Sequence, residues 1–457
     1  MLEEVDLGVE CACAAGPLDA AGQISRPPAR SRLRRRAALD RSEVGSYTPG
    51  GVIRKSIACL AVVLGLQLAP ALAQSKLDAP PLEQYLRWGP LRVRPGIELS
   101  DVGYDDNILA NDLNMVSDYG ATVSPKLQGL LLLGDQAFLE LTQRFDFRFW
   151  LENTDQNFTN TLSSARLIYP HRRMGFFADL LFERSNLRPT DLQQVLVERK
   201  EKRVGGGVIF TPSWRTEIEL GQYFSELDYD EENIAFRQDR DERTTRLDTS
   251  YRVFGRSRIL FDALYRKIDF RNPFVVEDLV IPRDTVEQQL LGGLAFGEGG
   301  RLTGAFRVGW GTIDAEDELL EDLSELIGDL ELVLRAGSRT KLQLTGRRLP
   351  GFAVFGANAY YLETTVGLRA VRYLSRLWGV EAGGSVGRLT FPASINLLGR
   401  EDDITRWEVG ARLRLAENAI GRKVEYSIRV GRYRRDSTVD FQNLSRNTVG
   451  FDAVVGF

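Results

Sequence analysis

The feature that most constrains the fold is the alternation of apolar and polar side chains in residues 139–149. The apolar positions are Leu139, Leu141, Phe145, Phe147 and Phe149, with Gln143 as the single polar exception among them. The intervening positions are Glu140, Thr142, Arg144, Asp146 and Arg148. Because successive side chains of a β-strand point to opposite faces, this segment has one apolar and one charged face. Burial of unpaired charges in a dry core is costly, so the pattern predicts a strand with lipid on one face and water on the other.

The same period of two recurs in later segments such as 405–414 and 424–431. These segments lack the apolar spacing of i, i+3, i+4 and i+7 that an amphipathic helix requires. From Leu91 onward, about eighteen segments have this character, and each is long enough to cross a bilayer as a tilted strand. The chain is therefore expected to be an all-β transmembrane protein.

The connections between these segments alternate in length. Short turns are expected near residues 133–135, 169–172, 211–213, 254–256, 297–300, 336–338, 373–375 and 416–418. Longer polar loops are expected near residues 102–117, 185–197, 226–240, 271–284, 313–324, 349–357, 391–403 and 435–445, with a shorter one near 152–157. In outer-membrane barrels the short turns face the periplasm and the long loops face the outside. The alternation predicts an antiparallel up-and-down transmembrane β-barrel of about eighteen strands over residues 88–457, which a soluble β-sandwich does not explain.

The last predicted strand ends on an aromatic residue. One face carries Val449, Phe451, Ala453, Val455 and Phe457, and the other carries Gly450, Asp452, Val454 and Gly456. An open strand edge in lipid leaves backbone groups unpaired, so this strand is expected to pair with the first strand and close the barrel. Its apolar stripe resembles the C-terminal assembly signal of bacterial outer-membrane proteins, which implies recognition by the barrel-assembly machinery. An ordinary amphipathic strand is the alternative.

Residues 52–73 have the layout of a secretory signal peptide. Arg54 and Lys55 form a charged start, residues 57–68 form an apolar run, and residues 71–73 form an A-x-A cleavage site. The apolar run is too short to span a membrane as a helix. The mature chain is therefore expected to lie beyond the inner membrane, in the bacterial outer membrane.

Residues 1–51 are rich in Ala, Arg, Gly and Pro and have no apolar period, so they are expected to be disordered. A secretory signal normally begins only a few residues before its apolar run. Translation is therefore expected to start at Val52, which makes residues 1–51 an incorrectly assigned extension; an extended signal is the alternative. After cleavage, residues 74–87 are expected to form a periplasmic N-terminal segment.

Composition excludes several classes of chemistry. Cys11, Cys13 and Cys59 all precede the predicted cleavage site, so the mature chain is expected to lack disulfides, thiolate metal sites and cysteine nucleophiles. The single histidine, His171, lies in an expected periplasmic turn, whereas zinc sites and Ser-His triads need a well-placed imidazole. Mean hydropathy is −0.21, and no transmembrane helix is expected after residue 74. The net charge of −4 disfavours nucleic-acid binding.

The segment 93–108 reads VRPGIELSDVGYDDNI and is followed by SDY at 117–119 and SPKL at 124–127. This order of motifs resembles the putative β-barrel porin 2 family, as does the pattern RSRILFDALYR before IDF at 256–270. The resemblance extends over about residues 88–457. It implies an outer-membrane barrel without catalytic residues. Many members of the family are encoded beside exopolysaccharide synthesis and export machinery, so it also implies a role in polysaccharide secretion.

The polar face of the predicted strands carries charges of both signs. The predicted lumen-lining residues are Glu140, Arg144, Asp146, Arg148, Arg215, Glu217, Glu219, Glu363, Arg369, Arg406, Glu408, Arg412, Arg414, Glu425 and Arg429. Interleaved charges on neighbouring strands are expected to form ion-paired ladders that brace the wall, whereas a strongly selective pore would carry a ring of one sign. Trp150, Tyr361 and Tyr433 are expected to anchor the barrel at the membrane interface, with stacking on sugar rings as the alternative.

Two predicted loops have distinctive sequences. The acidic run from Glu226 to Asn233 offers oxygen ligands for calcium but lacks EF-hand spacing, so a solvated acidic loop is favoured. The stretch from Glu316 to Ile327 has apolar residues at helical spacing, which predicts a short helix that either folds over the mouth or lies on the surface. The residues that carry this spacing are Leu319, Leu320, Leu323, Leu326 and Ile327.

These observations favour a non-enzymatic outer-membrane channel or scaffold in exopolysaccharide export, with no cofactor and no metal. The expected partners are outer-membrane lipid, the barrel-assembly machinery, polysaccharide and periplasmic export components. A general diffusion porin for small solutes is the first alternative. An outer-membrane hydrolase is the second, and it would depend on His171, on the rim opposite to where such enzymes place their histidine.

Overall fold

The computed structural model describes residues 76–80, 82, 85–134, 136–187, 196–230, 238–276, 279–297, 300–318, 320–353, 360–392, 399–415, 423–439 and 442–456. All of them belong to one compact unit. The predicted extension 1–51, the predicted signal peptide 52–73, the turn 416–418 and Phe457 lie outside the described residues. In the described part of the chain, no helix is long and apolar enough to cross a membrane.

The sheet is a closed antiparallel barrel. It contains nineteen strands, of which β1 (Leu86–Trp88) is a three-residue strand beside β2, so eighteen strands form the wall. The first wall strand pairs with the last, which closes the barrel. The wall strands are β2 (Leu91–Asp105), β3 (Asp118–Leu133), β4 (Ala137–Trp150), β5 (Phe158–His171), β6 (Met174–Leu187), β7 (Val197–Ser213), β8 (Thr216–Tyr229), β9 (Arg240–Phe254), β10 (Ser257–Phe270), β13 (Thr285–Phe296), β14 (Leu302–Ala315), β15 (Leu323–Ala336), β16 (Thr340–Phe352), β17 (Tyr360–Tyr373), β18 (Trp378–Phe391), β19 (Arg400–Leu415), β20 (Lys423–Ser437) and β21 (Leu444–Gly456). The predicted fold class is confirmed.

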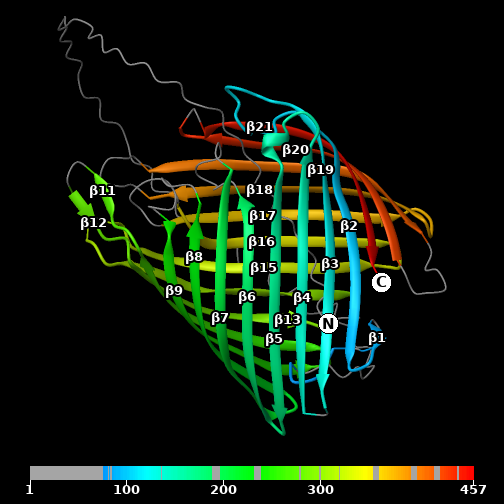
Figure 1. The fold of residues 1–457 in the computed structure, drawn as a ribbon, viewed down its shortest axis with the longest axis vertical. Helices are drawn as coiled ribbons and strands as arrows, with labels where there is room; N and C mark the ends of the chain where they lie inside the picture. The colour runs from blue at the N-terminus through cyan, green and yellow to red at the C-terminus, as the bar shows by residue number, and fades with distance from the viewer. Residues whose placement is uncertain are drawn as a thin grey trace, which may run out of the picture. The chain divides into compact units, whose positions relative to one another are not determined.

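Every wall strand pairs with its sequence neighbours, and the order of the strands follows the chain. In Figure 1, β3 to β8 lie side by side on one wall, and β15 to β18 cross behind them on the opposite wall. A short hairpin of β11 (Phe274–Val276) and β12 (Leu279–Ile281) lies in the connection between β10 and β13. The helical turn η2 (Thr154–Gln156) lies in the connection between β4 and β5.

The connections alternate in length as predicted. Short connections follow β3, β5, β7, β9, β13, β15 and β17, whereas longer ones follow the strands between them. Gly134 and Gly337 adopt positive φ values of 68° and 76° in two of the short turns, a conformation that glycine adopts without strain. The end with these turns is called here the short-turn rim, and the opposite end the long-loop rim.

Two local predictions are wrong. The turn expected at 211–213 lies at Trp214 and Arg215, because β7 continues to Ser213 through a register irregularity that accommodates Pro212. The helix expected from Glu316 to Ile327 is not formed, because β15 begins at Leu323. Near the long-loop rim this strand has apolar residues on both faces: Ile327 is 1% exposed on one face, and Leu326 is 51% exposed on the other. Because apolar residues occur on both faces of the strand, their spacing in the sequence resembles that of an amphipathic helix.

The closing pair of strands requires glycine at one position. Gly103 of β2 lies opposite Gly450 of β21, and a Cβ atom at Gly103 would lie 1.8 Å from the carbonyl oxygen of Val449. Just before it, Asp101 has a φ of 51° and marks a bulge between Leu99 and Val102. The bulge and the glycine together allow the two backbones to approach closely at this pair.

Residues of the Y-D-D-N-I motif form hydrogen bonds that link the first wall strand to the last. Asp106 accepts from the backbone and side-chain nitrogens of Asn447 at 2.7 and 2.6 Å. Asn107 is fully buried and donates through Nδ2 to the carbonyl oxygen of Ser445 at 3.0 Å. Asp105 accepts from Arg446 Nε at 2.7 Å. The motif therefore stabilises the closure at the long-loop rim.

Candidate functional site

The inside of the barrel is identified by a cavity whose lining comes from strands that are not neighbours. Asp101 of β2 and Arg148 of β4 line this cavity together with Glu331 of β15 and Glu363 of β17. Its volume is about 830 Å³. Because these strands meet only across the interior, the charged face of each strand is its inward face.

Ion pairs link β17, β18, β19 and β20 along this inward face. Arg369 Nη2 donates to Glu381 Oε2 at 2.9 Å and lies 3.3 Å from Glu408 Oε1. Arg412 Nε donates to the same oxygen of Glu381 at 2.7 Å, and its Nη1 donates to Glu425 Oε1 at 2.5 Å. The Glu381 residue is only 2% exposed, so these two guanidinium groups compensate its buried charge.

The same ladder continues across the closing pair of strands. Arg429 of β20 donates through Nε and Nη2 to the two carboxylate oxygens of Asp452 in β21, both at 2.8 Å. Asp452 also accepts from Ser427 Oγ at 2.7 Å and from the backbone nitrogen of Asp101 in β2 at 3.2 Å. Such bidentate, charge-assisted bonds are the strong ones. The ladder therefore connects the last strands to the first by side-chain as well as backbone bonds.

Near the short-turn rim, the inward face of β3 to β8 is apolar instead of charged, and residues that precede the barrel cover it. Leu77, which precedes the barrel, packs into a buried cluster and is itself 9% exposed. The wall residues of this cluster are Leu130, Phe138, Ile168, Phe177 and Ile209, with Leu132 and Tyr223 partly buried beside them. Gly175 of β6 leaves the space for Leu77, because a Cβ atom there would lie 2.2 Å from Leu77 Cδ2. We call this cluster the N-terminal socket.

Acidic side chains beside the socket hold Lys76. Its backbone nitrogen donates to Glu217 Oε2 at 3.1 Å, and its Nζ donates to Glu219 Oε2 at 2.8 Å. Glu219 also accepts from Arg166 Nη2 at 3.2 Å. Residues 74–87 were expected in the periplasm, but the described part contacts the inner wall from Lys76 onward. Sequence reasoning missed this contact, although the run of four leucines at 130–133, apolar on both faces, was a signal for it.

At the long-loop rim, connections from separate parts of the wall meet. Gln238, before β9, donates through Nε2 to the carbonyl oxygen of Ala353, after β16, at 2.8 Å. Arg283, before β13, donates to the same oxygen at 3.2 Å and is 1% exposed. The guanidinium of Arg240 stacks on the ring of Phe352, 4.6 Å from its centre. Nearby, burial raises the pKa of the Asp239 carboxyl. These contacts join connections from separate parts of the wall at this rim.

Two arginines in the central cavity remain accessible. The side chains of Arg347 and Arg406 are 53% and 44% exposed, and their nearest carboxylates, Glu363 and Glu408, lie 3.9 and 4.0 Å away. Within the described part of the chain, neither guanidinium has a hydrogen-bonded partner. The inward positions between them are small: Thr365, Gly367, Ser385 and Gly387. These arginines are therefore the charges most available to a solute.

Most of the charged residues picked from the sequence share the inward face. These are Glu140, Arg144, Asp146, Arg148, Glu217, Glu219, Glu363, Arg369, Arg406, Glu408, Arg412, Arg414, Glu425 and Arg429. Arg215 differs, because it lies in the exposed turn after β7 and stacks on Trp214. Sequence reasoning did not select Arg347, although it occupies an inward position of β16.

The aromatic residues expected at the membrane interface point inward instead. Trp150 is 7% exposed and packs with Ile108 and Leu109. Tyr361 packs against the ring of Phe391, 5.1 Å between centres, and Tyr433 lies against a buried cluster. The anchoring interpretation is therefore wrong for these three. Other aromatic residues are exposed near the rims, among them Tyr119 in β3, Trp214 in the turn after β7 and Trp378 in β18.

The structure shows no metal site at the described part of the acidic run 226–233, and it places His171 on the surface. Glu226 and Asp228 belong to β8 and pair with Lys202 and Arg271, while 231–233 lie outside the described residues. Among the residues that the structure describes, no cluster of His, Cys, Asp and Glu could hold a metal ion. His171 ends β5 at the exposed short-turn rim, as expected.

Comparison with known proteins gives one family and a set of related folds. The sequence model of the family described as Putative beta-barrel porin 2 matches residues 183–457. Two similar structures are from Pseudomonas aeruginosa. OccK2 (OpdF) has 11% identity and a TM-score of 0.46, with 80% of this chain and 98% of that chain covered. OpdK with vanillate has 10% identity and a TM-score of 0.44, with 80% and 99% covered.

The FrpB iron transporter from Neisseria meningitidis is also similar, with 8% identity and a TM-score of 0.44, covering 77% of this chain and 63% of that chain. None of the curated proteins searched matches the sequence.

Proposed function

The chain belongs to the Putative beta-barrel porin 2 family, and on this premise we propose that it is a passive, non-enzymatic channel for small hydrophilic solutes in the bacterial outer membrane. The observation that carries this proposal is the polar central cavity of about 830 Å³, bounded by charges of both signs. A wall braced by paired charges stays wet without favouring one sign strongly. The lumen-lining role of the inward charges is part of the same proposal.

Contacts at the two ends of the barrel support the proposal that the solutes are small. Lys76 and Leu77 occupy the inner wall at the short-turn rim. At the long-loop rim, Gln238 and Arg283 reach the carbonyl oxygen of Ala353 from another part of the wall. Both contacts reduce the open cross-section, so a size limit on solutes is expected.

The test is permeation of the purified mature protein. Reconstituted in planar bilayers, it should show steady ionic conductance, and liposomes that contain it should swell in small neutral sugars but not in larger oligosaccharides. An intact, heat-modifiable barrel without conductance or swelling would refute the channel proposal.

Export of exopolysaccharide is a second candidate, favoured by the resemblance of the Y-D-D-N-I segment to proteins encoded with export machinery. In that role the barrel would pass or guide a glycan, and the short-turn rim would contact periplasmic export components. Deletion should then abolish surface polysaccharide while synthesis inside the cell continues. Normal surface polysaccharide in the deletion strain would exclude this candidate and leave solute diffusion unaffected.

A further inference from the structure

The outer wall of the barrel carries a groove of about 1030 Å³ across β2 to β9. Most of its lining residues occupy outward strand positions, and the cross-strand register places seven of them in a continuous row that leads on to Lys267 of β10, outside the groove. In order from β3 to β10, the row is Gly129, Leu141, Ala165, Leu180, Val204, Phe224, Arg243 and Lys267. The row is therefore apolar for six strands and ends on two cations.

The row climbs the wall from one rim towards the other. Gly129 lies near the short-turn end of β3, whereas Lys267 lies near the long-loop end of β10. Neighbouring strands lie about 4.8 Å apart, so the apolar part is about 24 Å long. With strands tilted by about 40°, it rises about 15 Å, which equals the hydrocarbon depth of one leaflet. The groove thus spans the depth that one acyl chain occupies in a leaflet.

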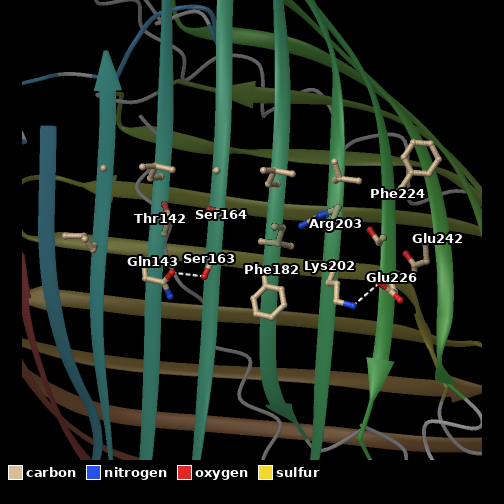
Figure 2. A pocket seen from close by; sticks show the side chains of 18 of the residues that line it. Thr142, Gln143, Ser163, Ser164, Phe182, Lys202, Arg203, Phe224, Glu226 and Glu242 are labelled. Carbon is tan, nitrogen blue, oxygen red and sulfur yellow. Dashed lines mark hydrogen bonds and ion pairs between the residues drawn. The ribbon is translucent and has the colours of Figure 1, made fainter. Parts of the chain in front are cut away.

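The polar side chains in the adjacent row of the groove are paired with each other. Gln143 Oε1 accepts from Ser163 Oγ at 2.6 Å, and Figure 2 shows this pair in the same row as Phe182 and the ion pair of Lys202 with Glu226. Because the amide and the hydroxyl satisfy each other, the lower part of the groove stays compatible with hydrocarbon.

The upper end of the groove is electrostatically unusual. Arg243 and Lys267 lie directly opposite each other on β9 and β10, and like charges in this position repel. Lys267 pairs with Asp269 at 2.6 Å, whereas Arg243 has no ion-pair partner among the described residues. The carboxylates above them are already engaged, because Arg271 pairs with Glu226, Asp228 and Asp241. An anion between Arg243 and Lys267 would remove the repulsion.

We propose that this groove binds the phosphorylated glycolipid of the outer leaflet, with one acyl chain along the apolar row and a phosphate between Arg243 and Lys267. Arg243 and Lys267 can both donate to an anionic headgroup, and the apolar row that leads to them fits a chain attached to that headgroup. The cations lie towards the long-loop rim, which faces the outer leaflet in this architecture. The site is independent of what the lumen conducts.

The test is binding of purified lipid A to the delipidated mature barrel, followed by native mass spectrometry. Arg243→Gln with Lys267→Gln should weaken binding about tenfold or more, because two charge-assisted contacts are lost. Ala165→Phe, which fills the groove without changing charge, should weaken it as well. The matched controls are Arg432→Gln, which removes an exposed outward arginine of β20, and Val366→Phe, on the opposite wall. Both should bind as the unaltered protein does.

Heat-modifiable migration on gels shows that each variant is folded. Dephosphorylated lipid A should bind the unaltered barrel as weakly as lipid A binds the double variant. Equal binding of phosphatidylglycerol and lipid A would overturn the assignment to the glycolipid. Equal lipid A binding by the double variant, the Ala165→Phe variant and the controls would overturn the site itself.

Discussion

Two parts of the inner wall differ in the side chains that line them and in whether another segment covers them. From β17 through β21 to β2, charged side chains span neighbouring strands, as in the bidentate bond of Arg429 to Asp452, and they leave a cavity open beside them. From β3 to β8, near the short-turn rim, apolar side chains leave a socket that Leu77 fills. Paired charges can hold a wall together and remain wet, whereas exposed apolar side chains must be covered. The barrel therefore has one polar, open side and one apolar, occupied side.

The ion-pair ladder and the segment in the N-terminal socket should differ in mobility. The ladder is part of the wall, because its members belong to strands whose backbones are paired on both sides. The socket is filled by a segment outside the wall. Leu77, Ala79 and Tyr85 pack on the socket, and Lys76 bonds to Glu217 and Glu219. Because residues 76–80 are not part of a paired strand, they should be easier to displace than any strand of the wall.

The largest expected effect concerns the closing pair of strands on the polar side. Gly103→Ala would place a Cβ atom 1.8 Å from the backbone carbonyl oxygen of Val449, which cannot move without breaking the pairing. Loss of the folded, heat-modifiable barrel from outer-membrane fractions is expected. Gly450→Ala is the matched control, because the nearest atom to its Cβ would be Asp101 Cα at an ordinary 3.7 Å. Equal levels of both variants would show that the close approach is not needed for closure.

The next effect tests whether the ladder stabilises the wall. Asp452→Ala leaves Arg429 half-buried without its bidentate partner, and the free energy of unfolding should fall by about 3 kcal/mol. Denaturant unfolding of the barrel in micelles measures it. Arg388→Gln removes exposed outward pairs with Glu401 and Asp403 and should cost far less. If the two losses are alike, the inward ladder contributes no more than surface charge.

A third prediction concerns release of Leu77 from the N-terminal socket. Leu77→Asp would put a carboxylate into an apolar cluster, which is unfavourable enough to release the segment. Gly175→Val would fill the same space from the wall, with its Cβ 2.2 Å from Leu77 Cδ2. Both variants should raise single-channel conductance, whereas Leu77→Ile should not.

The reverse experiment uses the expected absence of cysteine from the mature chain. A disulfide between Leu77→Cys and Gly175→Cys should hold the segment on the wall and remove any openings of larger conductance until a reductant is added. Unchanged conductance in the Leu77→Asp, Gly175→Val and disulfide-linked proteins would mean that the segment does not obstruct the channel.

The polar side was largely predictable from sequence, and the apolar side was not. Alternation in a strand such as 139–149 fixes which residues share a face, and the length of each connection fixes the rims. Arg148 and Arg412 therefore lie where the period of two predicts, whereas Glu381 was not selected. The socket depends on contacts between Leu77 and Phe177 or Ile209, which lie far away in the chain and have no local signature. Near the long-loop rim the alternation also fails, because an inward residue such as Ile327 is apolar and buried, and this produced the incorrect helix.

The smallest expected effect concerns the open side. Arg347 and Arg406 are half-exposed, and their nearest carboxylates are 3.9 and 4.0 Å away, so they attract mobile anions more than the paired arginines do. Replacing both by serine should shift the reversal potential in a salt gradient modestly towards cation selectivity, with conductance nearly unchanged. Arg388→Ser, on the outward face, should leave the reversal potential unaltered. The shift should shrink as ionic strength rises, because screening weakens the field of exposed charges within a Debye length of about 10 Å at 0.1 M salt. A reversal potential that is the same in the double variant and the unaltered protein would show that ions do not pass these two arginines.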